Sequence, residues 1–489
     1  MAARTGRQYM DRLASTRPTI EIDGDRVHGP VTEHPALRGV IRSYADLYDM
    51  QHDPVHADVL TYVCGDTSER VGSSFLIPRN STDLEHRRLG FRAWADYSLG
   101  TLGRSGDYLN SALMALSQAG DWFAQADPQF AVNIAAYYEK VRDEDLLCTH
   151  TLVPPQVNRA VGAAQQIDGR ALGAHVVRQD DNGIVIRGAR MLATLGPVAD
   201  ELLVFPSVLL RRTAEDEPYS FAFAINCDAP GLRFVCRESL DYGRGHPFGS
   251  RFDEIDALVV FDDVHVPWER VFTLGRPELC NGFYTETSAV VHMTHQVTAR
   301  ATAKAEAFLG LASLMSEAIG IEHFPHIQED TAELITIVGI LDGLNRAAES
   351  AAAVNEFGVF TPAWEPLNTA RNWFAQASQR LPEIIRRFGA GGLMQIPTDR
   401  DIVGSAAHDI ERYLQSATLA GPERIRLFRL AWDLAISSFG GRQNLYEHYV
   451  FGDPVRMSAA LVKTTDLDEY RDRVHAFLNH APTTTPTFL

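Results

Sequence analysis

The sequence predicts an α+β protein in which a mainly helical N-terminal part, a central β-barrel and a C-terminal helical bundle follow one another. Apolar residues recur at helical spacing up to about residue 149 and again after residue 276, whereas short apolar runs of strand length fill the stretch between. The composition, 45% hydrophobic and 22% charged, is that of an ordinary globular protein. We therefore expect three units, at 1–149, 150–275 and 276–489.

In the first unit, a helix is expected to begin just after residue 105. Its apolar stripe has the spacing i, i+4 and i+7, at Leu109, Leu113 and Leu116. Ser105 is suited to the N-cap, and Asp107 falls in the first turn, where the helix dipole favours an acid. Gly103 and Arg104 are thus expected at a loop-to-helix junction.

The second unit is rich in Val, Ile and Phe. Asn182-Gly183 between two apolar runs predicts a hairpin, because both residues tolerate positive φ. Strand-length runs then follow at 201–210, 219–226, 231–239 and 257–267. A barrel or a sandwich of roughly a hundred residues fits this spacing.

The third unit returns to long helical patterns. These cover 298–320, 329–358, 370–389 and 422–440. Apolar stripes of this length predict a bundle of antiparallel helices.

The net charge and the cysteine content exclude several classes of function. The balance of 45 Lys+Arg against 63 Asp+Glu gives a net charge of −18, which argues against binding to nucleic acid or to an anionic membrane surface. The five cysteines lack C-x-x-C spacing, so a disulfide framework or a structural zinc site is not expected. The N-terminus is polar, and no apolar run approaches the ~20 residues of a membrane helix, so we expect a cytoplasmic protein.

Common cofactor and catalytic motifs are absent from the sequence. It has no G-x-x-x-x-G-K-[ST], no G-x-G-x-x-G in a βαβ context, no H-E-x-x-H and no G-x-S-x-G. A Rossmann site for a nicotinamide nucleotide, a metal centre and a serine hydrolase are therefore not predicted. The pair His292 and His295 on a predicted helix is interpreted as structural.

Three polar stretches carry candidate chemistry. Arg104 and Tyr108 lie four residues apart at a helix start, where a guanidinium and a phenol can hold an oxyanion, although a solvated helix cap has the same pattern. The stretch 148–159 combines His150 with Thr, Gln and Asn side chains suited to a flavin's pyrimidine edge, or to capping a junction. The stretches 438–443 and 451–454 offer glycines and Arg442 for a ligand phosphate, or simply a C-cap and a turn.

Taken together, these stretches resemble the 4-hydroxyphenylacetate 3-monooxygenase family, the oxygenase components of two-component phenol hydroxylases. The matching segments are GRSGDY (103–108), CTHTLVPPQVNR (148–159), GARMLATLGPVADE (188–201), HPFGSRFDEIDALVVFDDVHVPWERVF (246–272) and SSFGGRQNLYEHYVFGDPVR (437–456). The resemblance implies the acyl-CoA dehydrogenase-like fold and a homotetramer. It also implies ortho-hydroxylation of a phenol, 4-hydroxyphenylacetate or a similar one, by a flavin C4a-hydroperoxide.

The resemblance also implies roles for individual residues. Arg104, Tyr108 and His150 would contact the phenolic oxygen; we hypothesise that His150 takes or shares its proton while the other two stabilise the developing charge. Ser207 falls where the family grips the far end of its substrate. FAD, used as FADH2 with molecular oxygen as co-substrate, would contact His150, Thr151, Leu152, Gln156, Val157, Asn158, Arg159, Thr194, Gly441, Arg442, Gly452, Asp453 and Pro454.

An oxygenase without a nicotinamide site needs a separate NAD(P)H:flavin reductase. Three alternatives stay open at this stage: a radical dehydratase of the 4-hydroxybutyryl-CoA type, an acyl-CoA dehydrogenase-like flavin dehydrogenase or oxidase, and a scaffold that has lost catalysis. The first would need cysteine ligands for an iron–sulfur cluster, and Ala299 stands where one is expected after His292.

Overall fold

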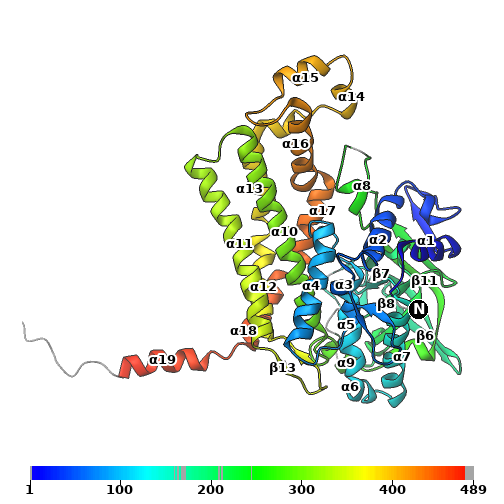
Figure 1. The fold of residues 1–489 in the computed structure, drawn as a ribbon. Coiled ribbons are helices and arrows are strands. Elements are labelled where there is room, and N and C mark those ends of the chain that lie inside the picture. Colours follow the sequence, from blue (N-terminus) through cyan, green and yellow to red (C-terminus); the bar gives the residue numbers. More distant parts are fainter. Residues whose placement is uncertain are drawn as a thin grey trace, which may run out of the picture.

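The computed structural model describes residues 3–158, 160–161, 165–166, 172–206, 210, 213–243 and 245–479. Helices, two stacked sheets and a second set of helices follow one another along the chain (Figure 1). The sequence patterns predict this order, and it is that of the acyl-CoA dehydrogenase-like fold, which the family resemblance implies. One continuous apolar core runs through all three parts.

The N-terminal part is mainly helical, as expected. Its helices are α1 (Gly6–Ser15), α2 (Arg38–Met50), α3 (Ala57–Leu60), α4 (Ser81–Tyr97), α5 (Gly106–Gln118), α6 (Gly120–Ala124) and α7 (Pro128–Glu144). Ser105 occupies the N-cap of α5 and Asp107 its first turn, which confirms the predicted helix start. The part also contributes β1 (Thr19–Ile22) and β2 (Asp25–Arg26), and β1 pairs in parallel with a strand of the central module.

The central module consists of two open sheets, so the prediction of a closed barrel is corrected to a sandwich. The six-stranded sheet has the order β2-β1-β10-β11-β7-β6 and the four-stranded sheet the order β12-β9-β8-β5. Their remaining strands are β5 (Cys148–Thr151), β6 (His175–Asp180), β7 (Gly183–Thr194), β8 (Glu201–Val204), β9 (Phe221–Asn226), β10 (Leu232–Cys236), β11 (Asp256–Pro267) and β12 (Val271–Leu274). The edge of the larger sheet is covered by β1 and β2 from the distant N-terminal part, a pairing that no local pattern reveals.

The predicted hairpin forms between β6 and β7. Its ladder ends at the pair Asp180 and Gly183, so the two turn residues are Asp181 and Asn182. The turn is therefore one residue earlier than the Asn182-Gly183 turn that the sequence suggested, because Gly183 already pairs with Pro267 of β11.

The C-terminal bundle is built on two long helices, α10 (Ala289–Ile319) and α11 (Pro325–Ser350). The other helices of this part are α9 (Pro277–Gly282), α12 (Trp364–Ala377), α13 (Arg380–Gly389), α14 (Asp399–Ile402), α15 (Ala407–Tyr413), α16 (Gly421–Ala435), α17 (Ser438–Tyr449), α18 (Pro454–Thr464) and α19 (Asp468–Asn479). The helix expected over 370–389 is split before Arg380, because Pro382 is tolerated only in a first turn. The helix expected over 422–440 ends at Ala435, and Ser437 caps α17, accepting a hydrogen bond from Gly440 N at 3.2 Å.

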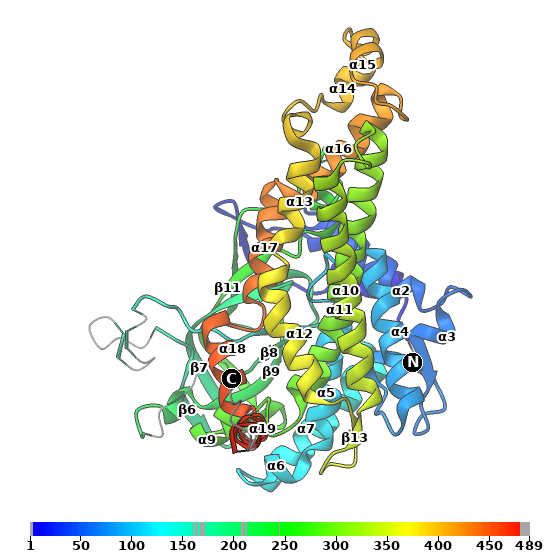
Figure 2. The same ribbon diagram turned by 90° about the vertical axis from the view of Figure 1, so that its left-hand side faces the viewer.

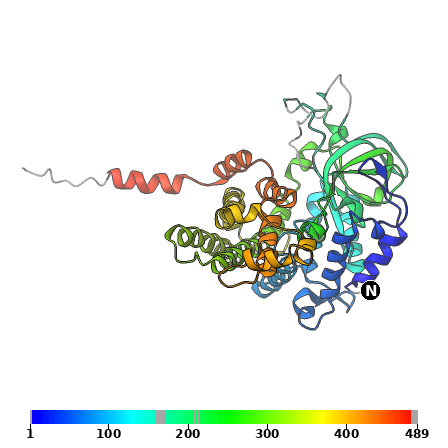
Figure 3. The ribbon, with the colours of Figure 1, turned by 90° about the horizontal axis from the view of Figure 1, so that it is seen from above.

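Helix α10 joins the bundle to the N-terminal part by packing against α4 and α5 (Figure 2). Helices α14 and α15 form a projection at one end of the bundle, and α19 extends away from the body (Figures 1 and 3). Among the described residues, no helix combines the length and the apolar character needed to cross a membrane.

Candidate active site

The loop 98–105 between α4 and α5 carries Arg104, and other parts of the chain hold it through its backbone. Arg300 of α10 donates to the carbonyl of Gly100 at 2.8 Å. Two side chains of α17 also donate to loop carbonyls, Gln443 to Thr101 at 2.9 Å and the Tyr446 hydroxyl to Gly103 at 2.8 Å. The shape of the loop is therefore set by the C-terminal bundle.

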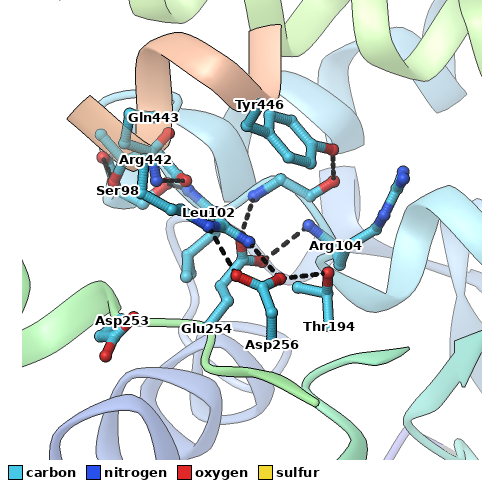
Figure 4. A network of polar contacts seen from close by, with 12 residues as sticks. Ser98, Leu102, Arg104, Thr194, Asp253, Glu254, Asp256, Arg442, Gln443 and Tyr446 are labelled. Atoms are coloured by element: carbon cyan, nitrogen blue, oxygen red, sulfur yellow. Dashed lines mark hydrogen bonds and ion pairs between the residues drawn. The ribbon is translucent and has the colours of Figure 1, made fainter. Parts of the chain in front are cut away.

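Glu254, just before β11, holds the same loop from the opposite side (Figure 4). Its carboxylate accepts the backbone N–H of Gly103 at 2.9 Å and that of Arg104 at 2.7 Å. The Arg442 guanidinium lies 3.3 Å from the same carboxylate, which is fully buried. Sequence reasoning missed Glu254, because its partners lie about 150 residues away.

Arg442 connects this loop to Thr194 through Asp256 (Figure 4). Asp256 Oδ1 accepts from Arg442 Nη2 at 2.8 Å and from the Thr194 hydroxyl at 2.7 Å. Burial alone would raise the pKa of Asp256, but Arg442 and Arg237 outweigh it and hold that pKa well below its usual range. The network thus links a predicted substrate-binding loop to a predicted flavin contact.

The stretch 438–443 is not a C-cap, because its residues form the beginning of α17. Gly440 packs against the backbone of Leu434, which a Cβ atom would approach to 2.5 Å. Arg442 is paired with two carboxylates, so its guanidinium is not free in the way that a phosphate ligand would require.

Arg104, Tyr108 and His150 lie together where the N-terminal helices meet β5. The guanidinium carbon of Arg104 is 4.4 Å from the ring centre of Tyr108 and 5.3 Å from that of Tyr446. The rings of Tyr108 and His150 are 5.8 Å apart. The structure therefore brings together the three residues that the sequence analysis assigned to the phenolic oxygen.

His150 is electrically neutral in this environment. Burial, and then the charge of Arg104, hold the pKa of His150 well below its usual value. Its Nδ1 is buried without a hydrogen-bond partner, and so is Nη1 of Arg104. A neutral imidazole beside a guanidinium with free donors can accept a proton from a phenol while the cation stabilises the phenolate.

The residues predicted around the flavin ring lie where β5 meets β7. Thr149 donates to the carbonyl of Thr194, and the Thr151 hydroxyl donates to the carbonyl of Met191 at 2.9 Å. Leu152 follows directly, and beyond it Gln156, Val157 and Asn158 are exposed. Thr194 is thus brought next to the end of β5 that carries His150, Thr151 and Leu152.

Other predicted flavin contacts lie on the C-terminal helices α17 and α18 or on the turn between them. Gly452, Asp453 and Pro454 form the turn from α17 into α18, where Asp453 caps α18 and α18 packs against α12. Gly441 lies on α17 with no atom within 4 Å of the position of a Cβ. Arg159 and Ser207 lie outside the described residues.

Two further buried polar side chains near the site had no signal in the sequence. Arg190 of β7 donates to the carbonyl of Leu152, and its Nε is buried without a partner. The hydroxyl of Tyr284 is likewise buried without a partner. Burial raises the pKa of Tyr284 well above its usual value, and Arg104 and Arg190 are both close enough to oppose that rise.

The histidine pair on α10 has protein partners. His292 Nδ1 accepts from Arg87 at 3.2 Å, and His295 Nε2 lies 2.8 Å from a carboxylate oxygen of Glu349. In the part of the chain that the structure describes, no group of three potential metal ligands is found.

The fold and the site define a class, that of proteins with an acyl-CoA dehydrogenase-like fold whose site centres on an arginine, a tyrosine and a neutral histidine. Residues 5–273 match the family model described as "4-hydroxyphenylacetate 3-hydroxylase N terminal", and residues 280–479 match the corresponding C-terminal model. The chain belongs to the 4-hydroxyphenylacetate 3-hydroxylase family.

Individual relatives agree with this assignment. The 4-hydroxyphenylacetate 3-monooxygenase oxygenase component of Thermus thermophilus is 46% identical and covers 98% of each chain. A crystal structure of such an oxygenase component in complex with FAD and 4-hydroxyphenylacetate, also 46% identical, superposes with a TM-score of 0.93 over 98% of each chain. An archaeal 4-hydroxybutyryl-CoA dehydratase from N. maritimus shares the fold at 16% identity, with a TM-score of 0.88 over 99% of this chain and 96% of that one.

Proposed function

We propose that this protein is the oxygenase component of a two-component monooxygenase that uses FADH2 and molecular oxygen to ortho-hydroxylate a phenol similar to 4-hydroxyphenylacetate. The observation that carries the proposal is the neutral His150 beside Arg104 and Tyr108, each of the first two with a buried nitrogen that lacks a partner. Membership of the 4-hydroxyphenylacetate 3-hydroxylase family favours this function over a dehydrogenase or a non-catalytic scaffold.

In this proposal the chain binds and activates the phenol. Arg104 and Tyr108 hold the phenolic oxygen, and His150 accepts or shares its proton, which makes the ring a better nucleophile. The three side chains fix the ring in one orientation, because Tyr108 lies in the first turn of α5, His150 lies on β5, and the loop that carries Arg104 is held by Glu254 and Tyr446.

The end of β5 fits a flavin. Leu192, next to the bridge between Val153 and Met191, exposes 58% of its surface, and Val157, four residues after Val153, exposes 51%, while Thr151 and Thr194 supply polar groups on the same strands. An isoalloxazine ring needs an apolar surface with a few polar groups at its edge. Reduced FAD, when bound, supplies the activation of molecular oxygen.

A separate NAD(P)H:flavin reductase is the proposed source of FADH2, because the sequence has no dinucleotide fingerprint. We also propose a cytoplasmic location, supported by five unpaired cysteines.

A homotetramer is the proposed assembly. Helix α19 buries none of its residues and exposes an apolar stripe of Tyr470, Val474 and Phe477 at i, i+4 and i+7. In addition, the predicted flavin contacts 452–454 lie at the start of α18, which packs against α12, and we propose that they reach the flavin of a second copy of the chain.

The proposal is tested with Arg104→Ala and His150→Ala in an assay that couples the protein to a flavin reductase and NADH. Loss of one contact to the phenolic oxygen should lower catechol formation by roughly 10²- to 10³-fold. The dissociation constant for FAD should stay the same in Arg104→Ala, because Arg104 is not a predicted flavin contact. Unchanged product formation in either variant would refute the assigned roles.

A further inference from the structure

Lys304 is a buried lysine on α10 whose ammonium group contacts two side chains of α17. Its Nζ donates to Oε1 of Gln443 at 2.8 Å and to Oε1 of Glu447 at 2.6 Å. Burial lowers the pKa of Lys304 to about 8, against the opposing charge of Glu447, so the ammonium group keeps its proton at neutral pH. A buried ion pair often contributes no net stability, so stability alone does not explain a lysine at this position.

The contact with Lys304 sets the orientation of the Gln443 amide. The amide offers one acceptor, Oε1, and one donor group, Nε2, so it can bind both an ammonium group and a carbonyl group in only one of its two orientations. In that orientation Nε2 donates to the carbonyl of Thr101 at 2.9 Å. Lys304 therefore acts through Gln443 on the loop 98–105, which carries Arg104.

Glu447 connects Lys304 to a second contact of the same loop. Its carboxylate accepts hydrogen bonds from both Nη atoms of Arg300, at 2.7 and 2.8 Å, and Nη1 of Arg300 also donates to the carbonyl of Gly100. Burial would raise the pKa of Glu447, but Arg300 and Lys304 outweigh it and lower that pKa to about 2, so the carboxylate is ionised. Two successive carbonyl groups of the loop thus depend on one buried cluster of α10 and α17 side chains.

The loop also lies directly on α10 at Lys304. A Cβ at Gly100 would come within 2.6 Å of the Cβ and the backbone nitrogen of Lys304, and the φ angle of Gly100 is +71°. Glycine permits both the close approach and this backbone conformation. The loop is therefore in contact with α10 at the same residue whose side chain orients Gln443.

We propose that Lys304 is a positioning residue for the phenolic substrate, because its contacts with α17 fix the loop 98–105 in the shape that places Arg104 at the phenolic oxygen. The inference rests on the proposed function, in which Arg104 is one of the groups that hold this oxygen. In this role Lys304 acts through the loop and not by contact with the substrate. A displacement of a binding group by about 1 Å can lower a rate by about 10²-fold, so a small shift of the loop is sufficient.

A buried ion pair elsewhere in the molecule provides a matched control. Arg88 of α4 is 8% exposed, and its Nε donates to Glu349 of α11 at 2.9 Å. Its ion-pair partners, Glu85 and Glu349, both lie outside the loop 98–105. Arg88→Met therefore removes a buried cation, as Lys304→Met does, but leaves the contacts of the loop in place.

The test is calorimetric binding of 4-hydroxyphenylacetate and of phenylacetate, which lacks the phenolic hydroxyl, to the FAD-loaded protein. The ratio of the two dissociation constants measures the contacts to the phenolic oxygen, because the two ligands are otherwise identical. The unmodified protein should prefer the phenol. Lys304→Met should lower that preference roughly 10-fold, as expected for weakening of a charged hydrogen bond. Arg88→Met should keep the original ratio, although both variants should unfold at a lower temperature.

A second variant, Gln443→Glu, tests the same contact if Lys304→Met does not fold. The new carboxylate still accepts from Lys304, and it balances the two cations of the cluster, but it has no donor for the carbonyl of Thr101. We expect it to lower the preference for the phenol to a similar extent.

An equal loss of affinity for both ligands in Lys304→Met would overturn the proposal, as would an unchanged ratio in Gln443→Glu. Amide hydrogen exchange over residues 98–105 separates the two levels of inference. If the unmodified protein forms no catechol but the loop exchanges faster in Lys304→Met than in Arg88→Met, the proposed function fails and the restraint of the loop by Lys304 stands. If catechol forms and the loop exchanges equally fast in both variants, only the assignment of Lys304 fails.

Discussion

The carboxylate of Glu254 lies against the backbone of Arg104 and accepts its N–H at 2.7 Å, so the residue predicted to hold the phenol is itself held by the central module. The same carboxylate accepts the N–H of Gly103, whose carbonyl accepts from Tyr446 on the C-terminal bundle. The loop therefore takes its shape from two parts of the chain that are remote in sequence.

Replacing Glu254 by Gln should weaken phenol binding. The amide oxygen of Gln can accept a hydrogen bond from only one of the two backbone N–H groups, those of Gly103 and Arg104. The amide NH2 would then lie against the other N–H, and two donors cannot form a hydrogen bond. Loss of a charged hydrogen bond corresponds to about 1.5–3 kcal/mol, roughly 10- to 100-fold in the dissociation constant of the phenol. The constant for FAD should not change.

Asp253→Asn is the matched control for Glu254→Gln. Asp253 is a buried acid on the same segment that accepts from Arg237 and from the backbone of Leu240 but does not contact the loop 98–105. Both variants should unfold at a lower temperature, whereas only Glu254→Gln should alter phenol affinity. Equal effects on affinity would show that the segment acts through general stability.

Gly103→Ala should displace the same loop by steric conflict. A Cβ at Gly103 would lie 2.4 Å from the ring of Tyr446, which is closer than carbon atoms approach. We expect lower phenol affinity and a lower thermal midpoint. The double variant Gly103→Ala/Tyr446→Leu should lose less than the sum of the single effects, because the second change removes the ring that conflicts.

Gly441→Ala on the same helix as Tyr446 serves as the comparison, since nothing lies within 4 Å of its Cβ position. An alanine inside a helix should leave stability unchanged or raise it slightly. Strict additivity of Gly103→Ala and Tyr446→Leu would argue against the steric conflict.

Asp107 predicts a pH dependence of stability. Burial raises the pKa of Asp107 to about 6 from its ordinary value of 3.8, against the opposing hydrogen bonds of Ser105 and Gln296. The folded chain therefore binds more protons than the unfolded chain between these two pH values, and stability falls as pH rises through this window. Above pH 6 the carboxylate costs about 3 kcal/mol.

Asp107→Asn should accordingly be more stable than the unmodified protein at pH 7 and equal to it below pH 4. The asparagine oxygen can still accept from Gln296, which donates to Asp107 at 3.1 Å. Thermal midpoints measured from pH 4 to 8 check the profile. Asp121→Asn, an exposed first-turn acid of α6, should show no such profile, and a pH-independent difference for Asp107→Asn would contradict the explanation.

The sequence predicted those helix and turn positions that depend on interactions between residues close together in the chain. Ser105 and Asp107 mark the start of α5 because caps and helix dipoles act within one turn. The glycines at 440–441 suggested the end of a helix, because glycine is common there. In the structure the Ser437 hydroxyl instead caps the start of α17. The sequence did not decide between a barrel and a sandwich, and it did not reveal that β1 covers the edge of the larger sheet by pairing with β10, more than 200 residues away.

Some residues of the candidate site could likewise be predicted from the sequence, and others could not. Arg104, Tyr108 and His150 were found because they lie in recognisable segments, and the structure brings them together. Glu254 and Arg190 were not found, because each acts on a backbone group that is distant in the sequence. Their roles depend on tertiary packing, which one sequence does not display.

The apolar stripe of α19 should mediate assembly. Exposed Tyr, Val and Phe side chains at i, i+4 and i+7 are unfavourable in water, and α19 buries none of its own residues. Val474→Asp/Phe477→Asp places two charges on that stripe. We expect light scattering to show a smaller species than for the unmodified protein, since charges at an apolar contact are costly to bury. Asp472→Ala, an exposed change on the same helix, should leave the mass unchanged. An unaltered mass for the double variant would place the contact between copies elsewhere on the chain.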